Sequence, residues 1–187
     1  MSAETEIDVK ALDRQFGEGR IAGTLPPEFT VSQSRDYAAI RRLCVHPRIF
    51  PLIADDFHLD SKQWRTPESE EIVYLLATDE HGAFGLGIFH PITFVCWNAH
   101  FAFLPRGYGN RARLSFARML GWMWEKTTAQ KIVGEIVREN HLAIRFARSV
   151  GCEIYGINKK SFLRGGELRD QVCLGISKPE FLTQGTL

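Results

Sequence analysis

The segment from Pro105 to Gly109 has the residue types of a phosphate-binding site. It reads Pro-Arg-Gly-Tyr-Gly and lies between an apolar run and a helical pattern. Amides in the first turn of a helix donate to anions, and the helix dipole adds positive potential there. Gly107 and Gly109 lack side chains that would keep a phosphate away, and Arg106 and Arg111 add formal charge. The segment therefore predicts a pyrophosphate site, and a plain surface turn is the alternative.

Two common nucleotide-binding loops do not fit this segment. A Walker loop needs a Gly-Lys-Ser/Thr sequence, which does not follow here. A Rossmann fingerprint needs a third glycine and an acidic residue after the next strand, and both are missing. The order of the other elements must therefore decide what the glycines do.

The 187-residue chain has the composition of one soluble globular domain, with 44% hydrophobic residues. Its formal charge of +1 gives no reason to expect a nucleic acid or an anionic membrane as a partner. The sequence has no apolar run of roughly 20 residues and no signal-peptide core, which predicts a cytoplasmic protein. The 4 cysteines and 6 histidines have no metal-binding spacing, so we expect reduced thiols and no metal site.

Hydrophobic periodicity divides the chain into an N-terminal arm over 1–32 and a domain over 33–187. Ser34 and Asn140 are the expected helix caps, and Gly151 is expected to end the last helix. The predicted strands are 71–78, 83–90, 92–103, 131–137, 152–161 and 168–176, and the first two form a hairpin. The predicted helices are 34–45, a short helix or loop within 49–64, 110–126 and 140–150.

This order of elements, with the glycine motif at its centre, resembles the GNAT superfamily of acyl-CoA-dependent N-acyltransferases. The signature of that family is Arg/Gln-x-x-Gly-x-Gly/Ala, and its first four positions are matched from Arg106 to Gly109. A later family segment, Asn-x-x-Ala, is matched from Asn140 to Ala143. The resemblance covers roughly residues 34–178. The short chain with its arm also resembles divergent members encoded in phage genomes.

The resemblance implies an α+β fold, a mixed sheet with helices on both faces and splayed central parallel strands. It implies acetyl-CoA as co-substrate, with its pantetheine arm between the strands 92–103 and 131–137. A free amine would attack the thioester directly, and a backbone N–H of the first strand would hold the oxyanion. The residues implied in cofactor binding are Phe103, Leu104, Arg106, Gly107, Tyr108, Gly109, Asn110, Arg111, Asn140, Ala143 and Arg148.

The base that takes the amine's proton is expected among two residues. His100 shares one face of its strand with Asn98, opposite Phe101 and Phe103, and a histidine has an ordinary pKa of about 6.5. Glu135 is a lone carboxylate in an apolar strand, where burial would raise its pKa. The alternatives are a packed histidine and a solvated carboxylate at an edge.

Two positions depart from the family pattern. Arg111 stands where the signature has Gly or Ala, and Ala147 stands where many members place a tyrosine that protonates the departing thiolate. Tyr155, Tyr108 or water would then have to substitute. The acidic pair Asp55 and Asp56 lies where family members line the amine site, which suggests an acidic lip or simply a helix N-terminus.

Three hypotheses follow from these residues. The first is an N-acetyltransferase that acts on a small-molecule or protein amine. The second is a GNAT-like protein that binds acyl-CoA with little catalysis and serves as a sensor or assembly factor, which Ala147 and Arg111 favour. The third is an interaction domain that binds no CoA. Homodimer formation stays open in all three.

Overall fold

The computed structural model describes residues 29–58 and 60–178. Their strands form one seven-stranded sheet in the order β1-β2-β3-β4-β5-β7-β6. The strands are β1 (Thr30–Gln33), β2 (Val73–Asp79), β3 (Gly82–Pro91), β4 (Cys96–Phe103), β5 (Lys131–Val137), β6 (Glu153–Arg164) and β7 (Glu167–Ser177). The helices are α2 (Tyr37–Cys44), α3 (Phe50–Ile53), η1 (Pro105–Gly107, a 3₁₀ turn), α4 (Asn110–Lys126) and α5 (His141–Ser149). None of the described helices is long and apolar enough to span a membrane.

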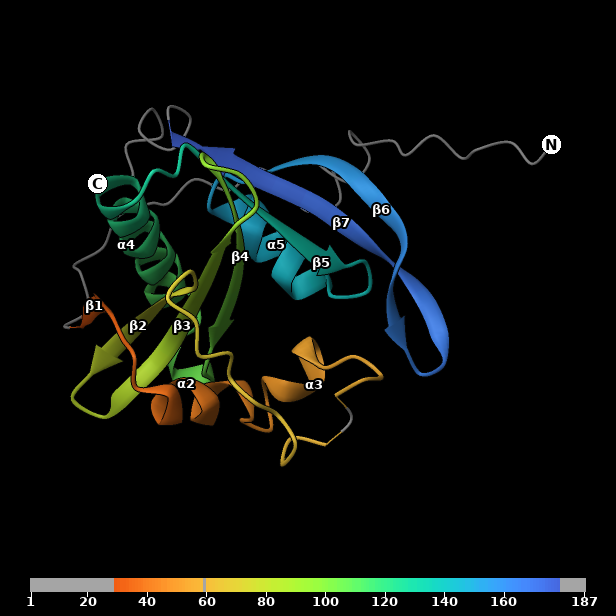
Figure 1. Cartoon of the computed structure of the whole chain (residues 1–187), viewed down its shortest axis with the longest axis horizontal. Coiled ribbons are helices and arrows are strands. Elements are labelled where there is room, and N and C mark those ends of the chain that lie inside the picture. The colour runs from red at the N-terminus through yellow and green to blue at the C-terminus, as the bar shows by residue number, and fades with distance from the viewer. Residues whose placement is uncertain (1–28, 59, 179–187) are drawn as a thin grey trace.

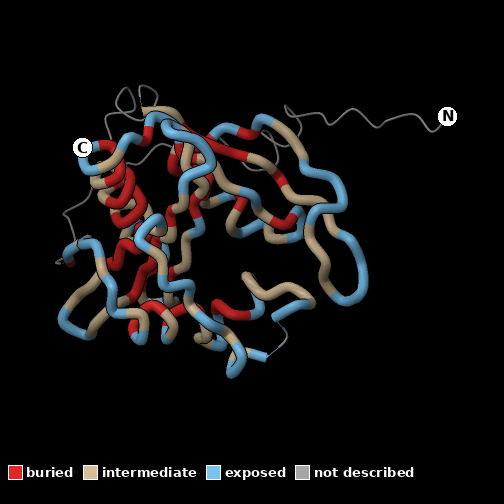
Figure 2. Tube along the Cα trace, in the orientation of Figure 1, coloured by how far each residue is buried: buried red, intermediate tan, exposed pale blue. Residues whose placement is uncertain are grey.

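Helices cover both faces of the sheet. Tyr74 and Leu76 of β2 pack with Ile40 and Leu43 of α2. Side chains alternate along a strand, so the intervening Leu75 lies on the other face, in the larger core that includes α4 and α5. Figure 1 shows α2 and α3 together and away from α4 and α5, and in Figure 2 buried positions follow α4 and the central strands. The predicted α+β fold is confirmed.

The two central parallel strands separate after a short pairing. β4 and β5 pair only from Cys96 with Lys131 to Asn98 with Val133. Beyond this point β4 stays paired with β3, and β5 stays paired with β7, to the ends of both strands. Figure 1 shows the arrows of β4 and β5 diverging. The prediction of splayed central strands is confirmed.

The helices that flank this gap begin where the sequence predicts. α4 occupies the predicted range 110–126. At the start of α5 the Asn140 side chain accepts a hydrogen bond of 3.2 Å from the amide of Ala143, which confirms the cap. Gly151 follows α5 with φ +90°, a conformation that favours glycine and ends the helix as expected.

Two details of the predicted elements are wrong. The cap of α2 is Asp36, which accepts from the amide of Ala39, while Ser34 lies outside the helix and accepts from the amide of Asp36. Residues 92–95 belong to the β3–β4 loop rather than to a strand, and the amide of Ile92 bonds to the carbonyl of Cys96. Three of these four loop residues are apolar, and the loop lacks glycine, proline, asparagine and aspartate, so the pattern is typical of a strand.

The edge strand β1 is an element that the periodicity did not predict. Its residues, Thr30–Gln33, are mostly exposed and pair with β2 along one side only. The proposed boundary between arm and domain, at 32/33, falls within this strand. Residues 1–28 of the predicted arm lie outside the described residues.

Gly107→Ala is expected to destabilise the protein by about 1–3 kcal/mol. A Cβ at this buried position would lie 2.5 Å from the Phe84 ring, so the ring or the loop has to shift. Denaturant unfolding measures the change. Gly156→Ala is the matched control, because a Cβ there meets nothing within 4 Å. Equal destabilisation by both variants would contradict the packing argument.

Candidate active site

A cavity of about 240 Å³ lies in the gap between β4 and β5. Ala99, His100 and Phe101 of β4 all line it, as do consecutive residues of β5. Successive side chains of a strand point to opposite faces, so a cavity that touches all of them lies at the strand edge and reaches both faces of the sheet. Ala143 of α5 lines one side, and Leu52 of α3 lines the other. The cavity therefore passes through the sheet.

The loop after β4 leads to the N-terminus of α4. Gly109 is the N-cap residue, with φ +70° and ψ −133°, and it has no side chain to accept from the first-turn amides. A Cβ on Gly109 would meet nothing within 4 Å, so the space beside this backbone is open. Gly107, by contrast, is buried against Phe84. Of the two motif glycines, only Gly109 stands beside open space.

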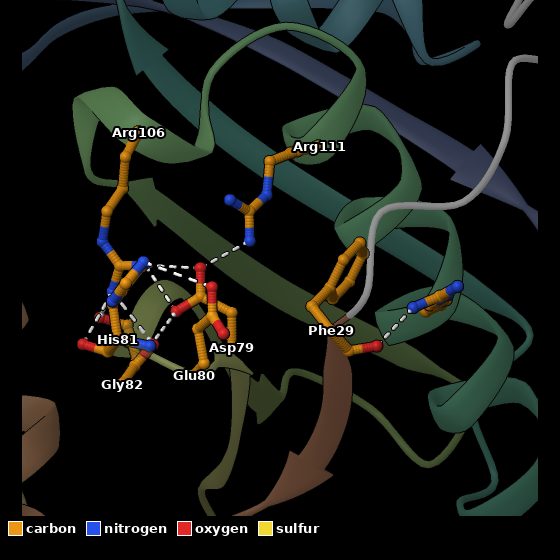
Figure 3. Close-up of polar contacts among 9 residues, drawn as sticks. Phe29, Asp79, Glu80, His81, Gly82, Arg106 and Arg111 are labelled. Atoms are coloured by element: carbon orange, nitrogen blue, oxygen red, sulfur yellow. Dashed lines mark hydrogen bonds and ion pairs between the residues drawn. The ribbon is translucent and has the colours of Figure 1, made fainter.

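The side chains of Arg106 and Arg111 converge on Asp79 (Figure 3). Nη1 of Arg106 donates to both carboxylate oxygens of Asp79 at 2.6 Å, and Nη2 of Arg111 donates to Oδ2 at 2.6 Å. Arg106 also donates to the carbonyls of Gly82 and Ala83 at 2.9 and 3.0 Å. Arg106 lies in the predicted loop and Arg111 in the first turn of α4, but the charges of both are directed at the β2–β3 turn. They join that turn to the start of α4.

The carboxylate of Asp79 is almost inaccessible, with 5% of its side chain exposed. Loss of hydration acts to raise its pKa, but hydrogen bonds from Arg106 and Arg111, and one from the amide of His81, outweigh this effect. The pKa of Asp79 therefore lies well below its usual range. The carboxylate stays charged at neutral pH and holds both arginines.

The two candidate bases lie on one face of the gap and both line the cavity. His100 stacks on His90, with ring centroids 5.7 Å apart and planes 22° apart. His100 is exposed, yet its pKa is lowered, first by the hydration it loses beside the cavity and then by the neighbouring His90, and Glu135 acts in the opposite direction. Glu135 is exposed and its Oε1 accepts from Nδ2 of Asn158 at 3.0 Å. The structure thus brings a neutral imidazole and a carboxylate together.

The two tyrosines considered as acids do not line the cavity. Tyr155 of β6 is 56% exposed, and Nζ of Lys131 lies 5.6 Å from its ring centroid. The pKa of Tyr155 is raised, mainly by loss of hydration and then by Cys173 and Glu135. Tyr108 is 55% exposed in the loop before α4. Neither residue replaces the tyrosine that is absent at Ala147.

The α5 side of the cavity contains Asn140, Ala143 and Ala147, together with the thiol of Cys152. Burial raises the pKa of Cys152 to about 12, so this thiol stays protonated. The other predicted cofactor residues lie around the cavity rather than in its wall. Phe103 is buried edge-to-face against Phe146, the amide of Leu104 bonds to Phe84, Arg148 donates to the carbonyl of Cys152, and Asn110 begins α4.

Sequence reasoning missed the wall on the opposite side, which combines α3 with the distant β6–β7 hairpin. Asp56 accepts hydrogen bonds of 2.7 Å from the amides of Gly165 and Gly166. Arg164 donates to the carbonyl of Ala54 at 2.9 Å. These partners are more than a hundred residues apart, so no local pattern signals them. Leu52, Ile53 and Phe162 thereby come to line the cavity.

The expected acidic lip is not among the residues that line the cavity. The carboxylate of Asp56 is bonded to the β6–β7 turn. Asp55 accepts from the amide of Phe57 at 3.0 Å and lies 2.8 Å from Nδ1 of His58. Asp55 therefore serves a local turn and Asp56 joins the chain after α3 to the β6–β7 turn. Neither residue begins a helix, so the expected helix N-terminus is wrong as well.

Comparison with solved structures places this geometry in a known fold. A chimaera based on the Vibrio cholerae spermidine N-acetyltransferase matches with a TM-score of 0.69 at 16% identity, over 83% of this chain and 99% of that one. The Vibrio cholerae enzyme in complex with CoA and spermine matches with a TM-score of 0.65 at 16% identity, over 83% of this chain and 98% of that one. A ribosomal-protein-S5-alanine acetyltransferase from Vibrio fischeri matches with a TM-score of 0.61 at 15% identity, over 86% of this chain and 98% of that one.

No protein-family model and no curated protein sequence matches the chain. At these identities the structural likeness concerns the fold. The chain has the GNAT fold, as the sequence resemblance predicts.

Asp79→Asn is expected to lower stability at neutral pH and to flatten its dependence on acid. A carboxylate whose pKa is lowered in the folded state stabilises that state at pH values above the pKa of the unfolded chain, 3.8. This stabilisation is lost as the pH falls toward the pKa of the folded state. Urea unfolding from about pH 7 to about pH 3 measures both effects. The control is Glu80→Gln, because Glu80 is 84% exposed. If stability depends on acid equally in Asp79→Asn and in the wild type, the ion pairs of Asp79 with Arg106 and Arg111 do not provide this stabilisation.

Proposed function

We propose that this protein is an N-acetyltransferase that transfers an acetyl group from acetyl-CoA to a primary amine by direct attack. The observation that carries the proposal is the cavity through the gap between β4 and β5. Its wall includes residues of α5 on one side and of α3 on the other, and we assign the α5 side as the donor entrance and the α3 side as the amine entrance. The GNAT fold supports the same arrangement.

The residues around the donor entrance fit a CoA group. Past Asn98 and Val133 the facing edges of β4 and β5 are not paired with each other, so their backbone groups suit the amides of a pantetheine arm. The backbone from Gly107 to Arg111 would take the pyrophosphate, because Gly109 stands beside open space at the N-terminus of α4. Acetyl-CoA supplies the thioester carbonyl that the amine attacks. A β4 amide near Ala99 would hold the developing oxyanion.

His100 is the proposed base. Its lowered pKa keeps the imidazole neutral at neutral pH, so it can accept the proton of the attacking amine. Glu135 lines the same cavity and raises the pKa of His100, which means that it favours the imidazolium once formed. Glu135 also attracts the substrate while the substrate is still an ammonium ion.

Apart from His100 in its protonated form, no side chain of the described cavity wall is a suitable acid for the departing thiolate. Ala147 offers no proton. With its pKa of about 12, Cys152 is a weaker acid than a free thiol of about 8.5, and so it does not protonate one. The thiolate therefore takes its proton from water or from the imidazolium of His100.

A second candidate function is acyl-CoA binding with little catalysis, as in a sensor or assembly factor. Ala147 favours it, because a binding protein needs no acid. Release of free thiol in the presence of amines separates the two functions.

Acetyl-CoA is expected to raise the melting temperature by several degrees. At a hundred times its dissociation constant a ligand stabilises by about 2.7 kcal/mol. Gly109→Trp should abolish this shift by covering the open space beside the loop. Gly156→Trp is the control, because a Cβ on Gly156 also meets nothing within 4 Å and Gly156 does not line the cavity. Equal stabilisation of both variants would contradict the proposed site.

The rate of acetyl transfer is expected to fall with acid as His100 becomes protonated, with a midpoint below the ordinary histidine value of 6.5. His100→Gln should lower kcat/KM by about 100-fold and remove this limb of the pH profile. His81→Gln is the control, since His81 is exposed at the β2–β3 turn and does not line the cavity. An unchanged acid limb in His100→Gln would assign the base to another group.

A further inference from the structure

The α3 side of the cavity has an uneven distribution of charge. Glu135 is the only carboxylate among the described residues that line the cavity, and no lysine or arginine lines it. Facing it from α3 and β6 are Leu52, Ile53 and Phe162, all apolar. From β7 come Gln171 and Gly175, which carry no charge. An amine that enters here meets one negative charge and an apolar wall.

Three acidic groups on the segments that flank this wall have partners elsewhere. Asp56 is bonded to the amides of Gly165 and Gly166, and Asp55 to Phe57 and His58. Asp170 accepts from the amide of Lys160 at 3.0 Å and lies 3.6 Å from Nη1 of Arg138. None of these three carboxylates lines the cavity. A second positive charge on the substrate would therefore find no ready partner.

The apolar wall is also held in place. The amide of Asp56 donates to the carbonyl of Leu163 at 3.1 Å, next to Phe162. Arg164 donates to Ala54, one residue after α3. Together with the Asp56 carboxylate bonds, these contacts tie the segment that holds Leu52 to the strand that holds Phe162. The wall cannot move away from a substrate without breaking them.

We propose that the acceptor is a primary amine with a single positive charge and an apolar substituent, rather than a polyamine. The ammonium group lies between Glu135 and His100, and the apolar substituent contacts Leu52, Ile53 and Phe162. A second ammonium group a few carbons along the substrate would lie against this wall, where loss of hydration without a counter-charge is costly. This inference rests on the proposed function and names the substrate class of the same site.

The test compares three amines in the presence of CoA or acetyl-CoA: 2-phenylethylamine, ethanolamine and spermidine. Thiol release gives kcat/KM, and calorimetric titration of the CoA-saturated protein gives the affinity for each amine. We expect 2-phenylethylamine to exceed both others by about tenfold or more in kcat/KM and affinity. The comparison with ethanolamine measures the effect of the apolar substituent, and the comparison with spermidine measures the effect of additional positive charge.

Leu52→Asp adds a second carboxylate to the wall and should shift the preference toward spermidine by about tenfold. Leu52 is 50% exposed, so the variant is expected to fold. Leu168→Asp is the matched control, because Leu168 is 58% exposed and does not line the cavity.

The outcomes distinguish the inference from the function on which it rests. Turnover that favours spermidine, or a Leu52→Asp variant whose preference equals that of Leu168→Asp, overturns the substrate class and leaves acetyl transfer standing. Binding that favours 2-phenylethylamine without any thiol release supports the substrate class and overturns acetyl transfer. Absence of both binding and turnover with all three amines overturns both.

Discussion

The early end of the pairing between β4 and β5 is the constraint on which the rest of the structure depends. Backbone N–H and C=O groups need hydrogen-bond partners. Where two neighbouring strands separate, the groups on their facing edges no longer bond to one another. Such an edge is costly in an apolar interior and favourable where an extended, amide-containing ligand or water completes it. The surrounding sheet keeps the gap open, because β3 and β7 hold the outer edges of these strands along their whole length.

The ion pairs of Asp79 with Arg106 and Arg111 fix the position of the chain at one end of this gap. The loop after β4 has to turn toward α4; Arg106 lies in this loop and Arg111 lies in the first turn of α4. A charged carboxylate with 5% exposure binds both guanidinium groups, so the loop is joined to the β2–β3 turn rather than left to move alone. Gly107 adds close packing on Phe84. The arginines of the motif therefore shape the site, and the backbone near Gly109 is the part that stands open to a ligand.

Local patterns predicted the elements well where burial gives a clear period. The helix 110–126 and the strand 131–137 were found with the predicted bounds, because the helix buries a regular set of apolar residues and the strand is a short, mainly apolar run. The patterns failed at β1, which is mostly exposed, and at Ile92, where apolar residues form a loop. They also missed the partners of Arg106 and Asp56. A charged side chain gives no local sign of whether a ligand or a distant part of its own chain will pair with it.

The lack of an acid at Ala147 limits the proposed reaction less than the lack of a base would. An amine that has attacked a thioester can be expelled again only while its nitrogen still carries the extra proton. Once His100 holds that proton, a nitrogen anion would be a far poorer leaving group than a thiolate, whose conjugate acid has a pKa of about 8.5. The forward direction is then decided on the side of the sheet where His100 and Glu135 lie. The opposite side has to provide space for the departing sulfur, and the small side chain of Ala147 leaves that space.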